Sequence, residues 1–162
     1  DSHPRRPRPQ TPGGDDYHGI KLSLTEAQRH KEKNKMTENE IGTLVIEKAI
    51  AIHRDLGPGL LESVYEAVLC HELVRAGVKA LRQVPIPFSY HDVKFDESFR
   101  ADIIVEQKVI LEIKSIENVN NVHKKQVLTY LRLSGLKLGY LLNFGEELMK
   151  DGIYRIINGK LE

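Results

Sequence analysis

Three charged side chains interrupt two otherwise apolar segments in the second half of the sequence. Asp102 lies in the run Phe-Arg-Ala-Asp-Ile-Ile-Val, and Glu112 and Lys114 lie in the run Val-Ile-Leu-Glu-Ile-Lys. A charge inside a central strand is costly to bury unless it is paired or bound to a metal, so each one requires an explanation. Since side chains alternate along a strand, Glu112 and Lys114 must project from the same face.

Asp102 joins that pair only if the two strands set residue 102 opposite residue 112. This register requires a loop with an odd number of residues, such as residues 106–108, because a two-residue loop would point Asp102 to the other face. We therefore predict a three-residue turn or an equivalent bulge, although the segment contains no glycine. Two carboxylates and an ammonium would then form a hard oxygen-ligand site suited to magnesium or manganese, where a bound ion activates water.

Further polar residues stand in a fixed order around these strands. Glu62 lies upstream, in the run Gly-Leu-Leu-Glu-Ser-Val-Tyr of residues 59–65. Gln126 and Tyr130 follow downstream, and their spacing puts both on one face of a predicted helix. Lys124 and Lys125 precede them and are candidate, unspecific phosphate contacts.

The spacing of Asp102, Glu112, Ile113 and Lys114 resembles the PD-(D/E)XK nuclease superfamily, whose motif is an aspartate, a variable gap, and Glu-X-Lys on the next strand. Ala101 stands where that motif has proline. The downstream Gln-x-x-x-Tyr is similar to a motif of related nuclease branches. Together with the Gly-x-x-Glu-x-x-Tyr block, these features resemble the GxxExxY protein family over about residues 38–159.

The resemblance implies an α/β fold of restriction-endonuclease type, with a mixed β-sheet flanked by helices. It also implies that Asp102, Glu112 and the main-chain carbonyl of Ile113 bind Mg²⁺ or Mn²⁺, with Glu62 acting directly or through water.

The same resemblance assigns roles in the hydrolysis of nucleic acid phosphodiesters. Lys114 would orient or help deprotonate the attacking water, while Gln126 and Tyr130 would position the site or the phosphate backbone. DNA is favoured over RNA by the resemblance alone. The alternative is a noncatalytic nucleic-acid-binding or assembly module that retains the fold, and a third class is a protein-interaction partner in a larger complex.

Plainer interpretations stand beside these. Asp102, Glu112 and Lys114 would also suit a strand-end salt bridge, and Glu62 a first-turn residue favoured by the helix dipole. Tyr65 and Tyr130 would also suit the edge of the core with their hydroxyls in water.

Residues without a chemical role are also predicted. We expect Glu66 and Glu72 in solvent and Cys70 as a small buried side chain. The seven histidines show no paired ligand spacing, so surface or capping positions are expected for them.

The elements that must position these groups follow from the hydrophobic pattern. A capping box at residues 37–40 predicts a helix to about residue 56, and a second helix follows over about residues 60–76, with Val64, Val68 and Leu69 facing the core. Pro85 and Pro87 mark residues 80–90 as an edge strand before a polar turn at residues 91–97. Strands at 99–105 and 109–114, a helix at about 120–133, and strands at 137–143 and 153–157 complete the order ααβββαββ.

Composition sets the outer limits. Residues 1–35 carry eight basic and five acidic side chains and many prolines, so we predict a disordered basic extension, either native or in part added, before a domain at residues 36–162. That domain has a net charge close to −2, so an anionic substrate would have to meet a local basic patch. One cysteine excludes a disulfide framework and fits a reducing compartment such as the cytoplasm, and no apolar run is long enough to span a bilayer. A homodimer or a larger complex stays open.

Overall fold

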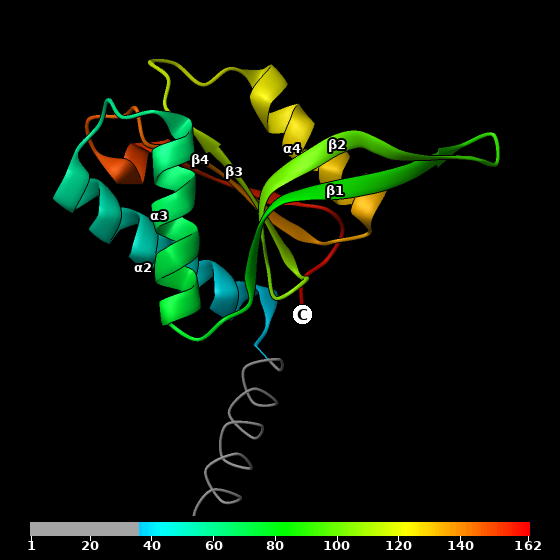
Figure 1. Ribbon diagram of the computed structural model, residues 1–162, viewed down its shortest axis with the longest axis horizontal. Helices are drawn as coiled ribbons and strands as arrows, with labels where there is room; N and C mark the ends of the chain where they lie inside the picture. The colour runs from blue at the N-terminus through cyan, green and yellow to red at the C-terminus, as the bar shows by residue number, and fades with distance from the viewer. Residues whose placement is uncertain (1–35) are drawn as a thin grey trace, which may run out of the picture. The chain divides into compact units, whose positions relative to one another are not determined.

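The computed structural model describes residues 36–162, except for the side chains of Glu97 and Ser98. The predicted disordered extension at residues 1–35 lies outside this range. The described part forms one five-stranded sheet with helices on both faces (Figure 1), in the predicted order of elements. The elements are α2 (Glu38–Leu56), α3 (Glu62–Arg75), β1 (Ala80–Tyr90), β2 (Val93–Val105), β3 (Val109–Lys114), α4 (Asn121–Ser134), β4 (Leu138–Asn143), the 3₁₀-helix η1 (Met149–Gly152) and β5 (Ile153–Ile157).

The sheet is mixed, as predicted, and its spatial order follows the chain from β1 to β5. Among the described strands only β3 and β4 pair in parallel, and α4 makes the crossover that a parallel pair requires. The strand β1 lies at one edge, where Pro85 and Pro87 remove no hydrogen bond from a central ladder.

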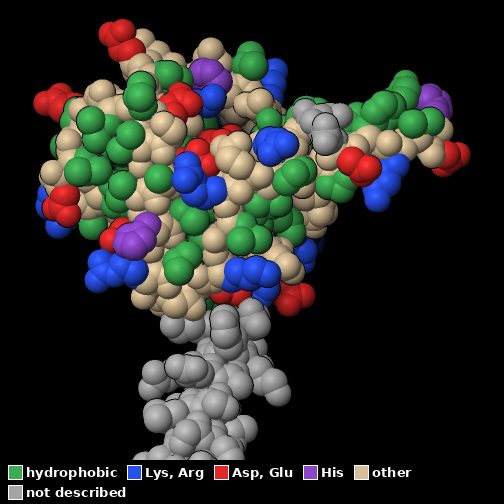
Figure 2. Space-filling model, in the orientation of Figure 1, with side chains coloured by type: hydrophobic (Ala, Val, Ile, Leu, Met, Phe, Trp, Pro, Cys, Tyr) green, Lys and Arg blue, Asp and Glu red, His purple; other side chains and the backbone are tan. Residues whose placement is uncertain are grey.

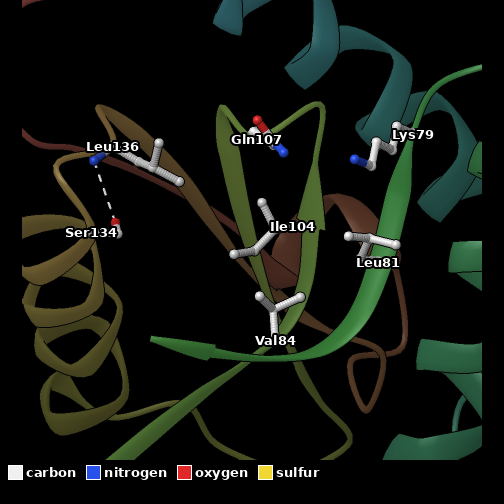
Figure 3. Close-up of a pocket in the computed structure, with 7 residues that line it drawn as sticks. All are labelled: Lys79, Leu81, Val84, Ile104, Gln107, Ser134 and Leu136. Atoms are coloured by element: carbon white, nitrogen blue, oxygen red, sulfur yellow. Dashed lines mark hydrogen bonds between the residues drawn. The ribbon is translucent and has the colours of Figure 1, made fainter. Parts of the chain in front are cut away.

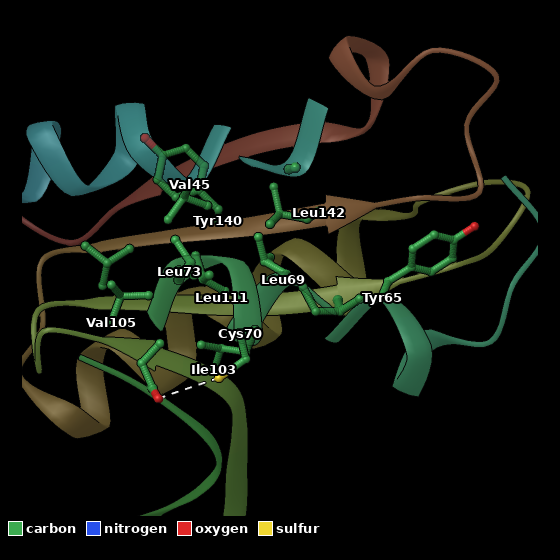
Figure 4. Close-up of a cluster of buried hydrophobic side chains, with 14 of the residues drawn as sticks. Val45, Tyr65, Leu69, Cys70, Leu73, Ile103, Val105, Leu111, Tyr140 and Leu142 are labelled. Carbon is green, nitrogen blue, oxygen red and sulfur yellow. Dashed lines mark hydrogen bonds between the residues drawn. The ribbon is translucent and has the colours of Figure 1, made fainter. Parts of the chain in front are cut away.

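Two hydrophobic clusters cover the two faces of the sheet. On one face α2 and α3 pack on alternate residues of the central strands, such as Ile103 and Leu111 (Figure 4). On the other face α4 packs on Ile110 and Leu141. The alternation of Ile110 and Leu111 between the clusters follows from the period of two in a strand.

The β2–β3 turn has the predicted three residues. Val105 pairs with Val109 and Ile103 with Leu111, so the register sets Asp102 opposite Glu112. Glu106 and Gln107 adopt positive φ angles of 52° and 53°, which allow the turn without a glycine. The backbone amide of Glu106 donates to Lys79 O at 2.7 Å, and its carboxylate accepts from Lys79 N at 2.6 Å, which stabilises this unusual backbone.

The β1–β2 hairpin differs from the prediction. The polar turn expected at residues 91–97 consists only of His91 and Asp92, with φ angles of 48° and 63°, and β2 begins at Val93. The predicted turn was wrong because Val93 and Phe95 continue the alternation of a strand. We call residues 86–99 of this hairpin the arm. It projects away from the helices (Figure 1), and β3 pairs with β2 only at residues 103–105.

The helices form where the hydrophobic pattern predicts them, but α3 buries a different face from the predicted one. The predicted capping box at Thr37 and Glu40 is present. The buried face of α3 consists of Tyr65, Glu66, Leu69, Cys70 and Leu73, and Val64 is exposed, contrary to the prediction. Among the described helices none has the length and apolar character to span a membrane.

Candidate active site

Asp102 and Glu112 meet across the β2–β3 ladder. The backbone amide of Asp102 donates to Glu112 Oε1 at 3.2 Å, and the amide of Ile113 donates to Asp102 Oδ2 at 2.8 Å. Each carboxylate is therefore held against the other strand. The side chain of Ile113 points into the opposite core cluster, as the strand alternation predicts.

Glu112 is 6% exposed, and burial is the main cause that raises its pKa from 4.5 to about 9. The negative charge of Asp102 raises this pKa further, whereas the ammonium of Lys114 lowers it. Lys114 therefore lies close enough to act on Glu112, on the face the alternation assigns to both. Within the described residues no Lys or Arg forms an ion pair with Asp102 or Glu112, so the predicted alternative of a strand-end salt bridge finds no support.

Glu62 begins α3 beside the same strand end. Its Oε1 accepts the backbone amide of Ser115 at 3.4 Å, and Ser115 Oγ donates to Leu60 O at 2.6 Å. These contacts place Glu62 at the end of β3, but through Ser115 and not in direct contact with Asp102 or Glu112.

The packing and hydrogen bonds of Tyr65 explain why the motif has a tyrosine three residues after Glu62. Its ring is fully buried and stacks on Phe144, with the centroids 4.4 Å apart. Its hydroxyl donates to Gly57 O and accepts from Leu60 N at 3.1 Å. The hydroxyl is therefore bound by two backbone groups, and it fixes the loop from which α3 starts.

Asn143 holds the segment that follows β3, and no sequence pattern predicts this role. It is fully buried, and its side chain makes two hydrogen bonds with the backbone of Ile116, at 3.0 and 2.9 Å, and one with the amide of Gly145 at 3.1 Å. This clamp keeps the chain after Lys114 in place.

Glu66 and Gln83 were also missed. The prediction that Glu66 lies in solvent was wrong, because it is 6% exposed and one turn after Glu62 on the buried side of α3. Its Oε1 accepts from Gln83 Nε2 at 2.9 Å and from Arg82 Nε at 3.4 Å. Gln83 Nε2 also donates to Asp102 Oδ1 at 3.4 Å, and Gln83 has a φ of 52°, which is strained for a non-glycine residue. Gln83 thus connects Glu66 to Asp102.

The helix α4 covers the site from the other side. Gln126 Nε2 donates to the hydroxyl of Tyr130 at 3.0 Å, so the predicted shared face is present. Burial raises the pKa of Tyr130, and the charges of Glu112 and Asp102 raise it further, which places the phenol near both carboxylates. Lys124 Nζ lies 4.3 Å from the ring centroid of Tyr154, while Lys125 is exposed.

His123 caps α4, as expected for a histidine, whereas His53 is buried and hydrogen-bonded to Glu146 O, contrary to that expectation.

An open cleft reaches Glu62 and Asp102, whereas Glu112, Lys114, Gln126 and Tyr130 are not among its lining residues. Its volume is about 680 Å³, and it is lined by Gly59, Leu60, Leu61, Glu62, Ser63, Glu66, Gln83, Asp102 and Ser115. A smaller cavity of about 180 Å³ lies between β1, β2 and the end of α4 (Figure 3). It is lined mainly by aliphatic side chains such as Leu81 and Ile104 and contains no carboxylate, so it is separate from the site.

Side chains alone supply only part of the ligands that a divalent cation needs. Within residues 36–162 no three His, Cys, Asp or Glu side chains are grouped closely enough to hold a metal. Asp102 and Glu112 nevertheless form an adjacent carboxylate pair, and Glu112 is buried without a cationic partner at ion-pair distance. A Mg²⁺ ion accepts one or two carboxylates completed by a carbonyl and water, so the pair fits such an ion.

The comparisons with known proteins agree with this arrangement. A family model described as the PD-(D/E)XK nuclease superfamily matches residues 39–156, which contain all of α3, α4 and β1 to β4, nearly all of α2 and β5, and every predicted site residue. No curated protein and no solved structure matches significantly. The mixed sheet flanked by helices is the restriction-endonuclease-like α/β fold of that group. The chain belongs to the PD-(D/E)XK nuclease superfamily.

Proposed function

We propose that this protein is a divalent-metal-dependent nuclease that hydrolyses phosphodiester bonds, with DNA favoured over RNA. The observation that carries the proposal is the meeting of Asp102 and Glu112 across the β2–β3 ladder, with Lys114 on the same face. A buried glutamate beside a half-buried aspartate at an open cleft has no structural advantage over apolar packing, which supports a chemical role.

A Mg²⁺ or Mn²⁺ ion would be held by Asp102, Glu112 and the carbonyl of Ile113, with Glu62 acting directly or through water. Gln83 and the amide of Ile113 orient Asp102 for this task. The ion supplies Lewis-acid stabilisation of the phosphoryl oxygens and lowers the pKa of water.

The side chains then divide the work of hydrolysis. Lys114 orients the attacking water and offsets negative charge on the phosphoryl oxygens. Water adds to phosphorus and releases a proton to solvent, the bond from phosphorus to the leaving sugar oxygen breaks, and that oxygen takes a proton from solvent. Tyr130, held by Gln126, and the basic Lys124 and Lys125 at the start of α4 contact the phosphate backbone.

We assign the chain to the GxxExxY branch of the superfamily. Gly59, Glu62 and Tyr65 support this, because the tyrosine fixes the loop that presents the glutamate. The single cysteine, Cys70, is buried and supports a reducing compartment such as the cytoplasm.

Cleavage of labelled DNA and RNA, each single-stranded and double-stranded, tests the proposal. Wild type is compared with Glu112→Gln in Mg²⁺, in Mn²⁺ and in a chelator, and Glu72→Gln serves as the control because Glu72 lies on the same helix as Glu62 but pairs with Arg75. We expect metal-dependent cleavage by wild type and by Glu72→Gln only. Binding without cleavage under every metal condition would instead support a noncatalytic module.

A further inference from the structure

The arm has one apolar and one polar face. Phe88 pairs with Phe95 and Tyr90 with Val93, so these four side chains share a face, whereas Ser89 and its partner Lys94 lie on the other. The apolar face is exposed: Tyr90 is 65%, Val93 54% and Phe95 41% accessible. Figure 2 shows hydrophobic side chains along one edge of the projecting arm and charged ones along the other.

The aromatic rings of this face form a continuous line towards the candidate active site. Phe88 stacks on Phe95 with centroids 5.1 Å apart, and Phe88 lies 5.7 Å from Phe99. Phe99 lies 5.4 Å from Tyr130, whose pKa is raised first by burial and then by the charges of Glu112 and Asp102. The strand β2 therefore carries Asp102, one member of the acidic pair, near its carboxyl end and the exposed ring of Phe95 near its amino end.

The chemistry of the face selects what it can bind. The described side chains of the apolar face carry no formal charge, and Lys94 on the opposite face pairs with Asp96 at 3.8 Å. Such a face offers phosphate groups no partner, but phenyl and phenol rings stack well on nucleobases. Bases expose their flat faces only where they are unpaired, so duplex does not suit this surface.

We propose that the arm is a stacking platform for unpaired bases, which makes a single-stranded segment the substrate that reaches the cleft. This inference rests on the proposed nuclease function. Residues 93–99 extend roughly 20 Å at about 3.3 Å per residue, enough to guide more than one nucleotide towards Tyr130. Basic groups at the start of α4 then meet the backbone closer to the carboxylates.

Binding in a chelator tests the arm independently of cleavage. Short fluorescein-labelled single strands of DNA and RNA, and the matching blunt duplexes, are titrated with the full chain and followed by fluorescence anisotropy. Three variants are compared: Tyr90→Ala with Phe95→Ala, Tyr90→Leu with Phe95→Leu, and Ser89→Ala. The leucine variant keeps an apolar surface without rings, and Ser89→Ala alters the opposite face of the same strand.

We expect wild type and Ser89→Ala to bind single strands more tightly than duplex. The alanine and the leucine variants should both lose about tenfold to a hundredfold in affinity for single strands. Unchanged affinity in the alanine variant, or full affinity in the leucine variant, would overturn the platform. A loss of self-association in the alanine variant on size-exclusion chromatography, with unchanged affinity for single strands, would overturn it in favour of a second copy of the chain.

The same strands in Mg²⁺ and Mn²⁺ separate this inference from the proposed function. Cleavage that is equal in wild type and in the alanine variant would contradict the platform and leave the nuclease intact. Arm-dependent binding with no cleavage under any metal condition would contradict the nuclease and leave the platform intact.

Discussion

Apolar side chains are usually buried and charged ones exposed, and the two ends of β2 depart from this rule in opposite ways. Near its carboxyl end, Asp102 lies between α3 and α4 beside a buried glutamate, and in the described residues every buried side-chain nitrogen or oxygen has a hydrogen-bond partner. Near its amino end, Val93 and Phe95 lie on a two-stranded arm with much of their surface in water.

Neither arrangement improves the stability of the chain. A buried glutamate next to a second carboxylate costs desolvation energy, and an exposed apolar strand pair promotes aggregation. The comparison teaches that both departures indicate function. The carboxyl groups at one end indicate a role in chemistry, and the exposed apolar surface at the other indicates a role in recognition. Substitutions at the two ends should therefore have different signatures.

The largest effect is expected at the acidic end. Asp102→Asn and Lys114→Ala should each lower the rate of cleavage by more than the roughly 10–100-fold that outer-shell changes around a metal cost. Circular dichroism should report folded proteins, and affinity for single strands in a chelator should be retained. If either variant kept the wild-type rate, the acidic end would lose its assigned role.

Gln83 offers a sharper test of the same end. Its amide donates to Glu66 and Asp102 without lying among the proposed metal ligands. Gln83→Asn preserves tolerance of a positive φ but shortens the side chain, so Asp102 loses an orienting partner. We expect a 10–100-fold weaker apparent affinity for Mn²⁺ in the cleavage reaction, largely restored by high Mn²⁺. A uniform fall in rate that no metal concentration restores would show a structural role only.

The pH dependence of stability separates the two ends without any substrate. The pKa of Glu112 is about 9 in the folded chain, whereas its ordinary value is 4.5. Between these values the folded chain binds the extra proton, so the stability of the metal-free protein should fall as pH rises through this window. Glu112→Gln should remove part of that fall and raise the melting temperature at pH 8 by on the order of a few degrees. Tyr90→Ala should leave the slope unchanged, and an equal slope in Glu112→Gln and wild type would contradict the burial of a proton at Glu112.

The smallest effect is expected at the loop that presents Glu62. Tyr65→Phe keeps the ring against Phe144 but removes the hydroxyl that binds Gly57 and Leu60. Losing these bonds should cost about 1–2 kcal/mol in the free energy of unfolding, measured in urea. Tyr130→Phe serves as the comparison, since its hydroxyl has a side-chain partner on its own helix. A stability equal to wild type would mean that solvent replaces the loop contacts of Tyr65.

Much of the fold was predictable because it depends on local patterns. The capping box of α2, the edge prolines of β1 and the alternation in β3 each indicate their element directly. The register of Asp102 and Glu112 was predictable from the odd loop length, although no glycine marked the turn. That turn relies on Lys79, 27 residues away in sequence from Glu106, and such a contact leaves no local signal.

The site was predictable only where a motif carried it. Glu62, Asp102 and Glu112 stand at recognisable spacings, whereas Gln83 and Asn143 act through hydrogen bonds formed only in the folded chain. Glu66 looked like a solvated helix residue, because the phase of α3 was judged from Val64 rather than from Tyr65. The sequence did not predict the arm, because the charged residues between its aromatic positions are typical of a polar turn.

Calorimetric titration of Mn²⁺ into the substrate-free protein tests the central claim most directly, since no choice of substrate can hide the result. We expect binding to wild type and to Glu72→Gln that strengthens from pH 6 to pH 9 with release of a proton, because the high pKa of Glu112 means that Mn²⁺ must displace its proton. Glu112→Gln should bind far more weakly and without that proton. Equal binding by wild type and Glu112→Gln, or no binding by either, would contradict a metal-dependent acidic site at this end of β2.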